Sequence, residues 1–338
     1  MSRSRFGRLH AAAAALLVIL VAVPRPAHAY LKFGVAVNGR QVTVKWNQTP
    51  IRYYVAEGGV PGVGPPQLAA TLAQAFSTWQ AVPTASVSFE FAGYTNARPG
   101  EGDGRSTIGF LAEPDLDRVL ASTSLLIDDV TGELLEADIF FNSTFAWSVA
   151  PGGEAGRFDV ETIAVHEIGH LIGLGHSAIG ETEVSPSGRR VIAAETVMFP
   201  LAFGPGSVTN RRLRADDIAG ISDLYPDPAF EADTGSISGR VTRSGEGLFG
   251  AHVVAFNPAT GALVGSFSLN AHGEFSIAGL TPGPHVLRIE PLDDADVESF
   301  FEPDPPVEFD FRAVFFNQLV VAPRGADSGS VELAVQPK

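Results

Sequence analysis

The sequence contains no cysteine among its 338 residues. Disulfide bonds and thiolate metal sites are therefore excluded, and a tightly bound transition metal would have to be held by histidine and carboxylate groups. Basic residues are also few, since 23 lysines and arginines face 38 acidic residues, which gives a net charge of −15. A nucleic-acid-binding protein carries a basic patch. Because no stretch of the sequence supplies one, we expect no nucleic-acid partner.

Long apolar runs are absent too. The run near the N-terminus, Ala11–Val23, has 13 residues, fewer than the roughly 20 that a helix needs to span a bilayer. Arginines precede this run, and the small-x-small sequence Ala27-His28-Ala29 follows it, as in a secretory signal. We expect residues 1–29 to be a signal peptide that directs the protein to the periplasm or the medium and leaves no transmembrane segment after cleavage. A retained membrane anchor is the alternative.

Residues 30–226 alternate between helix and strand patterns. Residues 65–82 carry apolar side chains at helical spacing behind two prolines, and residues 213–225 are expected to form a helix that ends before a proline. Residues 180–195 are expected to be a polar loop. Strand patterns occur in residues 45–55, 86–91, 107–111, 120–128 and 134–142. Helices among several strands indicate an α+β fold with a mixed sheet.

Another helix is expected in the segment "RFDVETIAVHEIGHLIGLGH", residues 157–176. Asp159 is suited to the N-cap, and Glu161 would lie in the first turn, beside the positive end of the helix dipole. Gly173 and Gly175 are natural positions for the helix to end, because glycine readily adopts the left-handed conformation that closes a helix.

The same segment contains the pattern His166-Glu167-x-x-His170-x-x-Gly173-x-x-His176. Residues four apart lie on one face of a helix, so His166 and His170 can direct their imidazoles at one ion. A continued helix would carry His176 away. A sharp turn at Gly173, which has no Cβ, would return the chain and supply a third nitrogen. Three histidine nitrogens with one open position are the ligand set of a catalytic zinc site.

Glu167 adjoins the first of these histidines and can therefore lie beside the open position. Zinc lowers the pKa of a bound water toward about 7, and Glu167 would take up the proton of that water as general base. The same carboxyl would then pass the proton to the leaving amine, which amounts to hydrolysis of a peptide bond. A chance motif is the competing interpretation, but no histidine between Tyr30 and Pro226 lies outside the pattern.

The pattern resembles that of the metzincin zinc proteases, and Ser177 after the third histidine resembles the matrixins, the matrix-metalloproteinase-like group of that clan. "TVMFP" around Met198, the only methionine besides the initiator, resembles the methionine turn that lies beneath the metzincin zinc. The likeness covers about residues 45–226. It implies a twisted mixed sheet with an active-site helix and a C-terminal helix, and a structural role for Met198 that does not include ligation.

The resemblance also implies roles for residues near the methionine turn. Phe199, Pro200 and Leu201 would form one wall of the substrate pocket and favour an apolar side chain just after the scissile bond. Asp216 or Asp217 would be buried and hydrogen-bonded near the turn. Two solvated helix carboxylates are the alternative.

Some features of animal matrixins have no counterpart in the sequence. Without cysteine we expect no cysteine-bearing propeptide that blocks the zinc, and without spare histidines we expect one catalytic zinc and no second, structural zinc. Family members often carry structural Ca²⁺, which prefers hard oxygen ligands. Ordinary turn carboxylates are the alternative for the acidic residues concerned. These residues are Asp103, Asp128, Asp129, Glu136 and Asp138.

Residues 236–338 have a different pattern. Short alternating runs are separated by Gly, Pro and Asn about every ten residues, which predicts an all-β sandwich. "GSISGRVTRSGEGLFGAHVVAFNPATG" and "GEFSIAGLTPGPHVLRIEPL" resemble the carboxypeptidase-regulatory-like or transthyretin-like domain. His252, His272 and His285 have no ligand spacing and are expected to be surface or packing residues. Nothing in this part indicates chemistry, so we expect it to stabilise, to tether or to present substrate.

We therefore expect an α+β metzincin-type catalytic domain followed by an all-β sandwich. The expected boundaries are residues 1–29 for the signal peptide, 30–226 for the peptidase, 227–235 for a linker and 236–338 for the C-terminal domain. The expected function is a secreted zinc endopeptidase that acts on protein or peptide substrates with Glu167 as general base and acid. A secreted, zinc-holding binding or adhesion protein with little turnover is the alternative.

Overall fold

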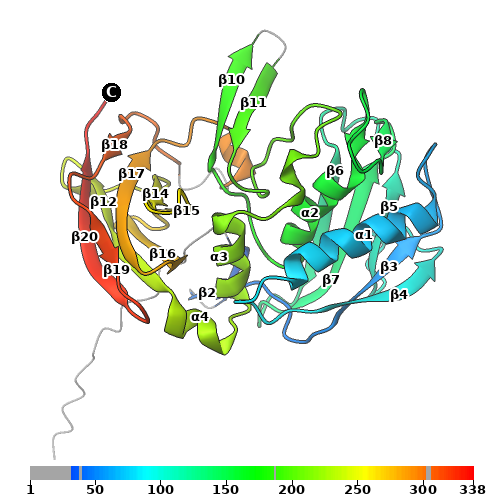
Figure 1. Ribbon diagram of the computed structural model, residues 1–338, viewed down its shortest axis with the longest axis horizontal. Coiled ribbons are helices and arrows are strands. Elements are labelled where there is room, and N and C mark those ends of the chain that lie inside the picture. The colour runs from blue at the N-terminus through cyan, green and yellow to red at the C-terminus, as the bar shows by residue number, and fades with distance from the viewer. Residues whose placement is uncertain (1–31, 38–39, 186–187, 302–305) are drawn as a thin grey trace, which may run out of the picture.

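A computed structural model describes residues 32–37, 40–185, 188–301 and 306–338. The expected signal peptide, residues 1–29, lies outside the described residues. Figure 1 shows two parts side by side, a mixed α/β part and a part made mainly of strands, with the helix α3 (Ala215–Leu224) between them. Within the described residues, no helix is both long and apolar enough to cross a membrane.

The first part is built on a five-stranded mixed sheet of order β4-β3-β5-β7-β6. Its strands are β3 (Ile51–Ala56), β4 (Phe89–Thr95), β5 (Ser106–Leu111), β6 (Ala121–Ile127) and β7 (Leu134–Asn142). Strand β3 pairs in parallel with β4 and β5, and β5 pairs in parallel with β7. The edge strand β6 runs antiparallel to β7. The expected mixed sheet is thus confirmed, with β4 beginning a few residues later than its pattern indicated.

Two long helices, α1 (Pro65–Gln80) and α2 (Val160–Leu171), lie on the same side of this sheet (Figure 1). The apolar stripe of α1 is buried between the sheet and α2, with Leu68, Leu72 and Trp79 at 0% exposure. The Trp79 indole nitrogen also donates a hydrogen bond to the Val165 carbonyl at 2.8 Å. This bond and the surrounding apolar contacts fix α2, and therefore the histidine motif, against strands β6 and β7 of the sheet.

The expected polar loop at residues 180–195 is wrong, because the segment forms the hairpin of β10 (Gly180–Ser185) and β11 (Gly188–Ala194). The hairpin projects from the body of the molecule (Figure 1), and even its apolar residues Val184 and Ile192 are 71% and 58% exposed. Val191 and Ala194 of β11 are buried against Phe199, but the sequence of β10 is mainly polar and lacks the apolar alternation by which strands are recognised. The remaining short strands of the first part are β1 (Gly34–Val37), β2 (Arg40–Thr43), β8 (Trp147–Ser148) and β9 (Phe158–Asp159).

The second part consists of two sheets that enclose one buried apolar cluster. The first sheet holds β12 (Gly235–Arg243), β13 (Glu246–Gly247), β16 (Glu274–Leu280) and β20 (Asp327–Val335). The second holds β14 (His252–Phe256), β15 (Leu263–Phe267), β17 (Gly283–Glu290), β18 (Val314–Phe315) and β19 (Val320–Ala322). Each of the short alternating runs identified in the sequence coincides with one of these strands.

The connection between the two parts is helical. The segment expected to be a linker contains α4 (Pro228–Asp233), whose N-cap Asp227 accepts a hydrogen bond from the Ala229 amide. The preceding helix α3 contributes to both apolar cores, because Ile221 and Leu224 pack in the first cluster and Ala219 packs in the second. The two parts therefore share a structural element and are not joined by a free tether.

Asp159 holds the start of α2 in place. Its carboxylate accepts hydrogen bonds from the Thr162 amide at 2.8 Å and the Thr162 hydroxyl at 2.7 Å, which caps the helix. Arg211 donates two further bonds to the same carboxylate, from Nε at 2.9 Å and Nη2 at 2.5 Å. The Asp159 side chain is only 1% exposed, so the paired arginine neutralises a buried charge.

Asp159→Ala is expected to lower the free energy of unfolding by about 3–5 kcal/mol. It removes the helix cap, and it deprives the largely buried Arg211 of the carboxylate that pairs with it. Asp159→Asn keeps an acceptor for the cap and should cost less. Urea denaturation of the two variants and the parent measures both losses. Equal losses in the two variants would contradict a separate contribution of the cap.

Candidate metal centre and substrate cleft

Helix α2 and the turn after it bring the three histidines of the motif together. His166 and His170 lie one turn apart on α2, and the helix ends at Leu171. Gly173 adopts a φ of +104°, and a Cβ there would lie 2.4 Å from the Val44 carbonyl oxygen. Only glycine fits this turn without strain. The turn reverses the chain and returns His176 to the other two histidines.

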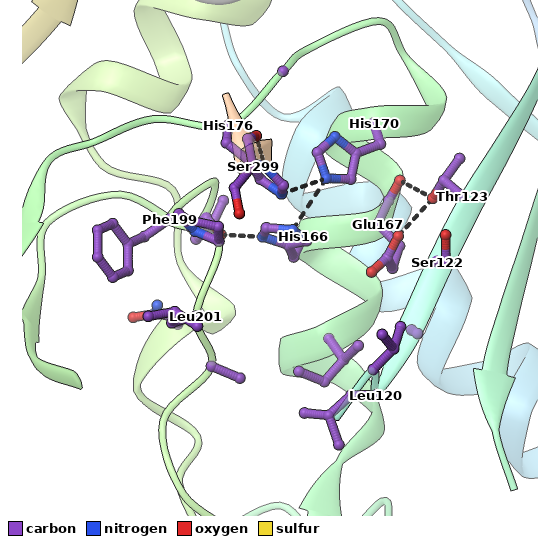
Figure 2. Close-up of a pocket in the computed structure, with 18 of the residues that line it drawn as sticks. Leu120, Ser122, Thr123, His166, Glu167, His170, His176, Phe199, Leu201 and Ser299 are labelled. Carbon is purple, nitrogen blue, oxygen red and sulfur yellow. Dashed lines mark hydrogen bonds between the residues drawn. The ribbon is translucent and has the colours of Figure 1, made fainter. Parts of the chain in front are cut away.

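The three rings face one another with their Nε2 atoms. The Nε2 atom of His170 lies 3.1 Å from that of His166 and 3.1 Å from that of His176 (Figure 2). Each Nδ1 atom instead faces a backbone carbonyl oxygen: Val197 at 2.7 Å from His166, Leu174 at 2.8 Å from His170 and Ser299 at 2.6 Å from His176. Among the described residues, these histidines form the group whose ligand atoms are placed to hold a metal ion.

The carbonyl contacts fix the tautomer of every ring. A carbonyl oxygen can only accept a hydrogen bond, so all three Nδ1 atoms must carry the proton and act as donors. The Nε2 atoms of neutral rings are then unprotonated, and three lone pairs converge on one point. Such an arrangement is unfavourable without a cation between the nitrogens. The donor set therefore fits a transition metal, because metal-binding histidines usually donate their other ring N–H to an acceptor such as these backbone carbonyls.

Burial keeps these rings neutral. It lowers the pKa of His166, and it lowers that of His176 to about 4 with a further contribution from His166. The pKa of His170 lies well below its ordinary value, because burial and repulsion by the two neighbouring rings both disfavour its charged form. Neutral imidazole is the form that binds metals.

Glu167 adjoins His166 on α2, and its side chain is directed at strand β6 (Figure 2). Its side chain is 5% exposed, and burial raises its pKa to about 7. The Thr123 hydroxyl, on strand β6, donates to Glu167 Oε2 at 2.7 Å and lies 3.1 Å from the Glu167 carbonyl oxygen (Figure 2). Sequence reasoning missed Thr123, because a strand pattern does not tell which of its residues will face a helix that follows much later in the chain.

Met198 packs against helix α2 at Gly169, the residue before His170. A Cβ added at Gly169 would lie 2.2 Å from the Met198 sulfur. Met198 is 2% exposed, and its carbonyl accepts a hydrogen bond from the Ser177 amide at 2.9 Å. The methionine thus supports the helix with its side chain and the third-histidine segment with its backbone.

Asp216 and Asp217, at the start of α3, are both buried, whereas the resemblance implied burial of one of them. Asp217 accepts hydrogen bonds from the Val197 amide at 3.1 Å and from the Thr196 hydroxyl, and so holds the methionine turn. Asp216 accepts from the Ser177 hydroxyl at 2.6 Å and from the Gly265 amide at 2.8 Å. Burial and the neighbouring Asp217 raise the pKa of Asp216 to about 7.

Residues 45–226 match the matrixin family model. This stretch is more than half of the chain and includes the five-stranded sheet, helices α1 to α3 and the three histidines. The chain belongs to the matrixin family. We refer to residues 45–226 as the matrixin region.

Three relatives illustrate the extent of the similarity. Matrix metalloproteinase-16 of Rattus norvegicus is 28% identical over 187 residues, which cover 54% of this chain and 28% of the relative. Metalloendoproteinase 1-MMP of Arabidopsis thaliana is 28% identical over 205 residues, 56% of this chain and 47% of the relative. Metalloendoproteinase 5-MMP of the same plant is 40% identical over 67 residues, 20% of this chain and 14% of the relative. The chain spans less than half of each relative, and the family supports a metalloprotease class for the matrixin region.

A cavity of about 460 Å³ opens beside the histidines. Phe199, Pro200 and Leu201 all line it, as do Leu120 to Thr123 on the opposite side. The Phe199 ring itself points away from the histidines (Figure 2) and packs with Val191 and Ala194. The cleft of the matrixin region thus runs between strand β6 and the segment after the methionine turn.

The carboxylates considered for calcium lie elsewhere, and several of them accept backbone hydrogen bonds. Asp138 accepts from the amides of Gly100 and Thr107, at 2.5 and 2.6 Å. Asp128 accepts from Val130 and Thr131 in a turn, at 2.9 and 2.8 Å. Glu136 holds the Gly104 amide and Asp103 that of Arg105. The contacts of Asp128 and Asp103 match the alternative of turn carboxylates, whereas Glu136 and Asp138 lie buried on strand β7. Calcium stays an untested prediction.

Gly173→Ala is expected to lower the free energy of unfolding by about 1–3 kcal/mol and to weaken metal binding, because a positive φ and a nearby carbonyl both oppose the new methyl group. Gly156→Ala is the matched control, since Gly156 has a φ of +77° but no heavy atom within 4 Å of the place that a methyl group would take. Thermal unfolding and metal titration of both variants measure the effects. Equal metal affinity in the two variants would contradict a role of the turn in placing His176.

Proposed function

We propose that the protein is a secreted zinc endopeptidase in which His166, His170 and His176 hold the zinc ion. The observation that carries the proposal is the convergence of three imidazole lone pairs beside the buried carboxylate of Glu167. Three neutral histidines with room for a further ligand suit a catalytic zinc better than a structural one. When bound, zinc supplies Lewis acidity, which polarises the peptide carbonyl and acidifies water at the site.

Glu167 is the proposed general base and acid. It lines the cavity next to the first histidine, so it can take a proton from the attacking water and return one to the leaving amine. Thr123 positions this carboxylate by donating to Oε2, which leaves the second oxygen to exchange protons. Because Thr123 acts through Glu167, it is a positioning residue.

The substrate is proposed to be a protein or peptide that lies along the cleft. Strand β6 borders the cleft and can present backbone groups to an extended peptide. Phe199, Pro200 and Leu201 are proposed to form the wall of the pocket for the side chain after the scissile bond. The apolar lining favours an apolar side chain there.

We propose the same domain organisation that the sequence predicts. Residues 1–29 would be removed as a signal peptide during export to the periplasm or the medium. Residues 236–338 would form a carboxypeptidase-regulatory-like β-sandwich, which the two sheets around one core support. The helix α4 within residues 227–235 would join this domain to the peptidase.

The purified protein is expected to bind about one zinc ion per chain and to cleave peptides in a chelator-sensitive manner. Glu167→Ala should retain the zinc and lose cleavage by several orders of magnitude, because the ligands stay and the proton carrier is gone. Metal analysis and peptide cleavage on the same batches measure both. Zinc in both proteins with no cleavage of a diverse peptide library would favour the binding or adhesion alternative.

Thr123→Val is expected to lower kcat about tenfold with unchanged zinc content, because the valine keeps the shape but cannot hold Glu167. Thr123→Ser keeps the hydroxyl and should retain most of the activity. Steady-state kinetics of the three proteins test this role. Equal activity in the valine and serine variants would show that the hydrogen bond does not matter for catalysis.

A further inference from the structure

The second part of the molecule reaches the cleft through the short turn η2 (Val297–Ser299) and the residue after it. Ser299 and Phe300 both line the cavity. The Ser299 carbonyl accepts the Nδ1–H of His176 at 2.6 Å, and Figure 2 shows Ser299 beside that ring. The Phe300 ring centroid lies 6.1 Å from that of His176, at 73° to its plane. Two consecutive residues from outside the matrixin region therefore contact one of its motif histidines.

This segment is anchored by an apolar cluster. The rings of Phe300 and Phe301 pack against Phe267 of β15, with centroids 5.8 and 5.3 Å apart. Ala178, two residues after His176, is buried in the same cluster. One cluster thus fixes both the segment that carries the third histidine and the segment that carries its acceptor.

A second tether joins the same two regions through Asp216. Its carboxylate accepts from the Ser177 hydroxyl with one oxygen and from the Gly265 amide of β15 with the other. The hairpin after His176 adds further bonds, because the Thr182 amide donates to Asp294 at 3.0 Å and Arg189 donates to the Asp293 carbonyl at 3.0 Å. The interface around the third histidine is therefore extensively hydrogen-bonded and partly buried.

His176 depends on such support more than the other two histidines do. His166 and His170 are carried by a helix, and their acceptors Val197 and Leu174 belong to the matrixin region. His176 follows a glycine turn and has no helix to orient it. Outer acceptors of this kind fix the ring orientation of metal-binding histidines, and their loss typically weakens metal binding or activity about 10–100-fold.

We propose that the C-terminal part is a component of the active site, with the Ser299 carbonyl as a positioning group for His176 and the Phe300 ring as a wall of the substrate cleft. This inference rests on the proposed peptidase function. It goes beyond the expectation that this part stabilises, tethers or presents substrate. The half-buried Phe300 ring favours peptides with an apolar side chain at the position next to His176 and disfavours charged side chains, which would lose hydration there.

Phe300→Pro tests the positioning role. Proline disfavours the helical conformation of the residue before it, and it removes the amide that donates to the Val297 carbonyl at 2.8 Å, so the Ser299 carbonyl must turn. We expect the Kd for zinc to rise about 10–100-fold in competition with a chromophoric chelator, without substrate present. Ser299→Ala keeps the carbonyl and should bind zinc as the parent does. Phe300→Ala loses the ring but keeps the amide and the turn, so it should weaken zinc binding less than Phe300→Pro.

Phe300→Ala tests the wall. The test is a peptide library varied at each position around the scissile bond. At a single position, the ratio of kcat/KM for apolar side chains to that for other side chains should fall about tenfold in the variant. Phe300→Leu retains an apolar wall and should keep the preference of the parent. An equal loss of kcat/KM at all positions would indicate a structural defect and contradict the role of Phe300 as a wall of the cleft.

The outcomes separate this inference from the proposed function. A parent protein that binds no zinc or cleaves no peptide would overturn the function itself. If the parent does both, unchanged zinc affinity in Phe300→Pro would overturn the positioning role, and an unchanged peptide ranking in Phe300→Ala would overturn the wall. If circular dichroism shows that Phe300→Pro is unfolded, Ser299→Gly, which loosens the turn, takes its place and is expected to weaken zinc binding in the same direction.

Discussion

Three hydrogen bonds from imidazole Nδ1 atoms to backbone carbonyls determine the geometry of the histidine site. They fix the tautomers, turn the rings and leave three unprotonated nitrogens directed at one point. The acceptors belong to the methionine turn, to the chain just after α2 and to η2. Because each acceptor is a main-chain atom, its position is set by the path of the backbone, and the site depends on the correct placement of three separate segments.

Two carboxylates of helix α3 hold the methionine turn and the chain after α2 in place. Asp217 binds the backbone of the methionine turn, and Asp216 connects the residue after His176 to strand β15. Buried carboxylates are costly unless they are hydrogen-bonded, and each of these accepts several bonds from groups that it thereby positions. The same helix contributes apolar side chains to both cores, so the two parts of the molecule are held in register at the point where the site needs it.

Much of the fold could be predicted from the sequence because the relevant signals are local. Helix α1 has a clear apolar stripe, the Asp159 cap is specified by its own side chain, and the turn at Gly173 follows from residue type. The spacing of the motif likewise predicted that His166, His170 and His176 would come together, as they do. Each of these inferences concerns residues that lie within a few turns of one another.

The features that escaped prediction depend on long-range placement or on the backbone. Thr123 meets Glu167 across 44 positions, through the register of an edge strand against a helix. The Ser299 acceptor is a carbonyl, which every residue possesses, so no residue type marks it. Strand β10 lacks apolar alternation because its described residues are all partly or fully exposed to solvent. Tertiary contacts, which local patterns do not encode, decide all three.

The acceptor of His176 is synthesised 123 residues after the histidine itself. During translation, N-terminal regions fold first. A nascent chain that has not yet reached η2 therefore has the complete motif and the turn that returns the third ring, but not the group that fixes that ring. The histidine site therefore has all three of its carbonyl acceptors only after η2 has been synthesised and has packed beside His176.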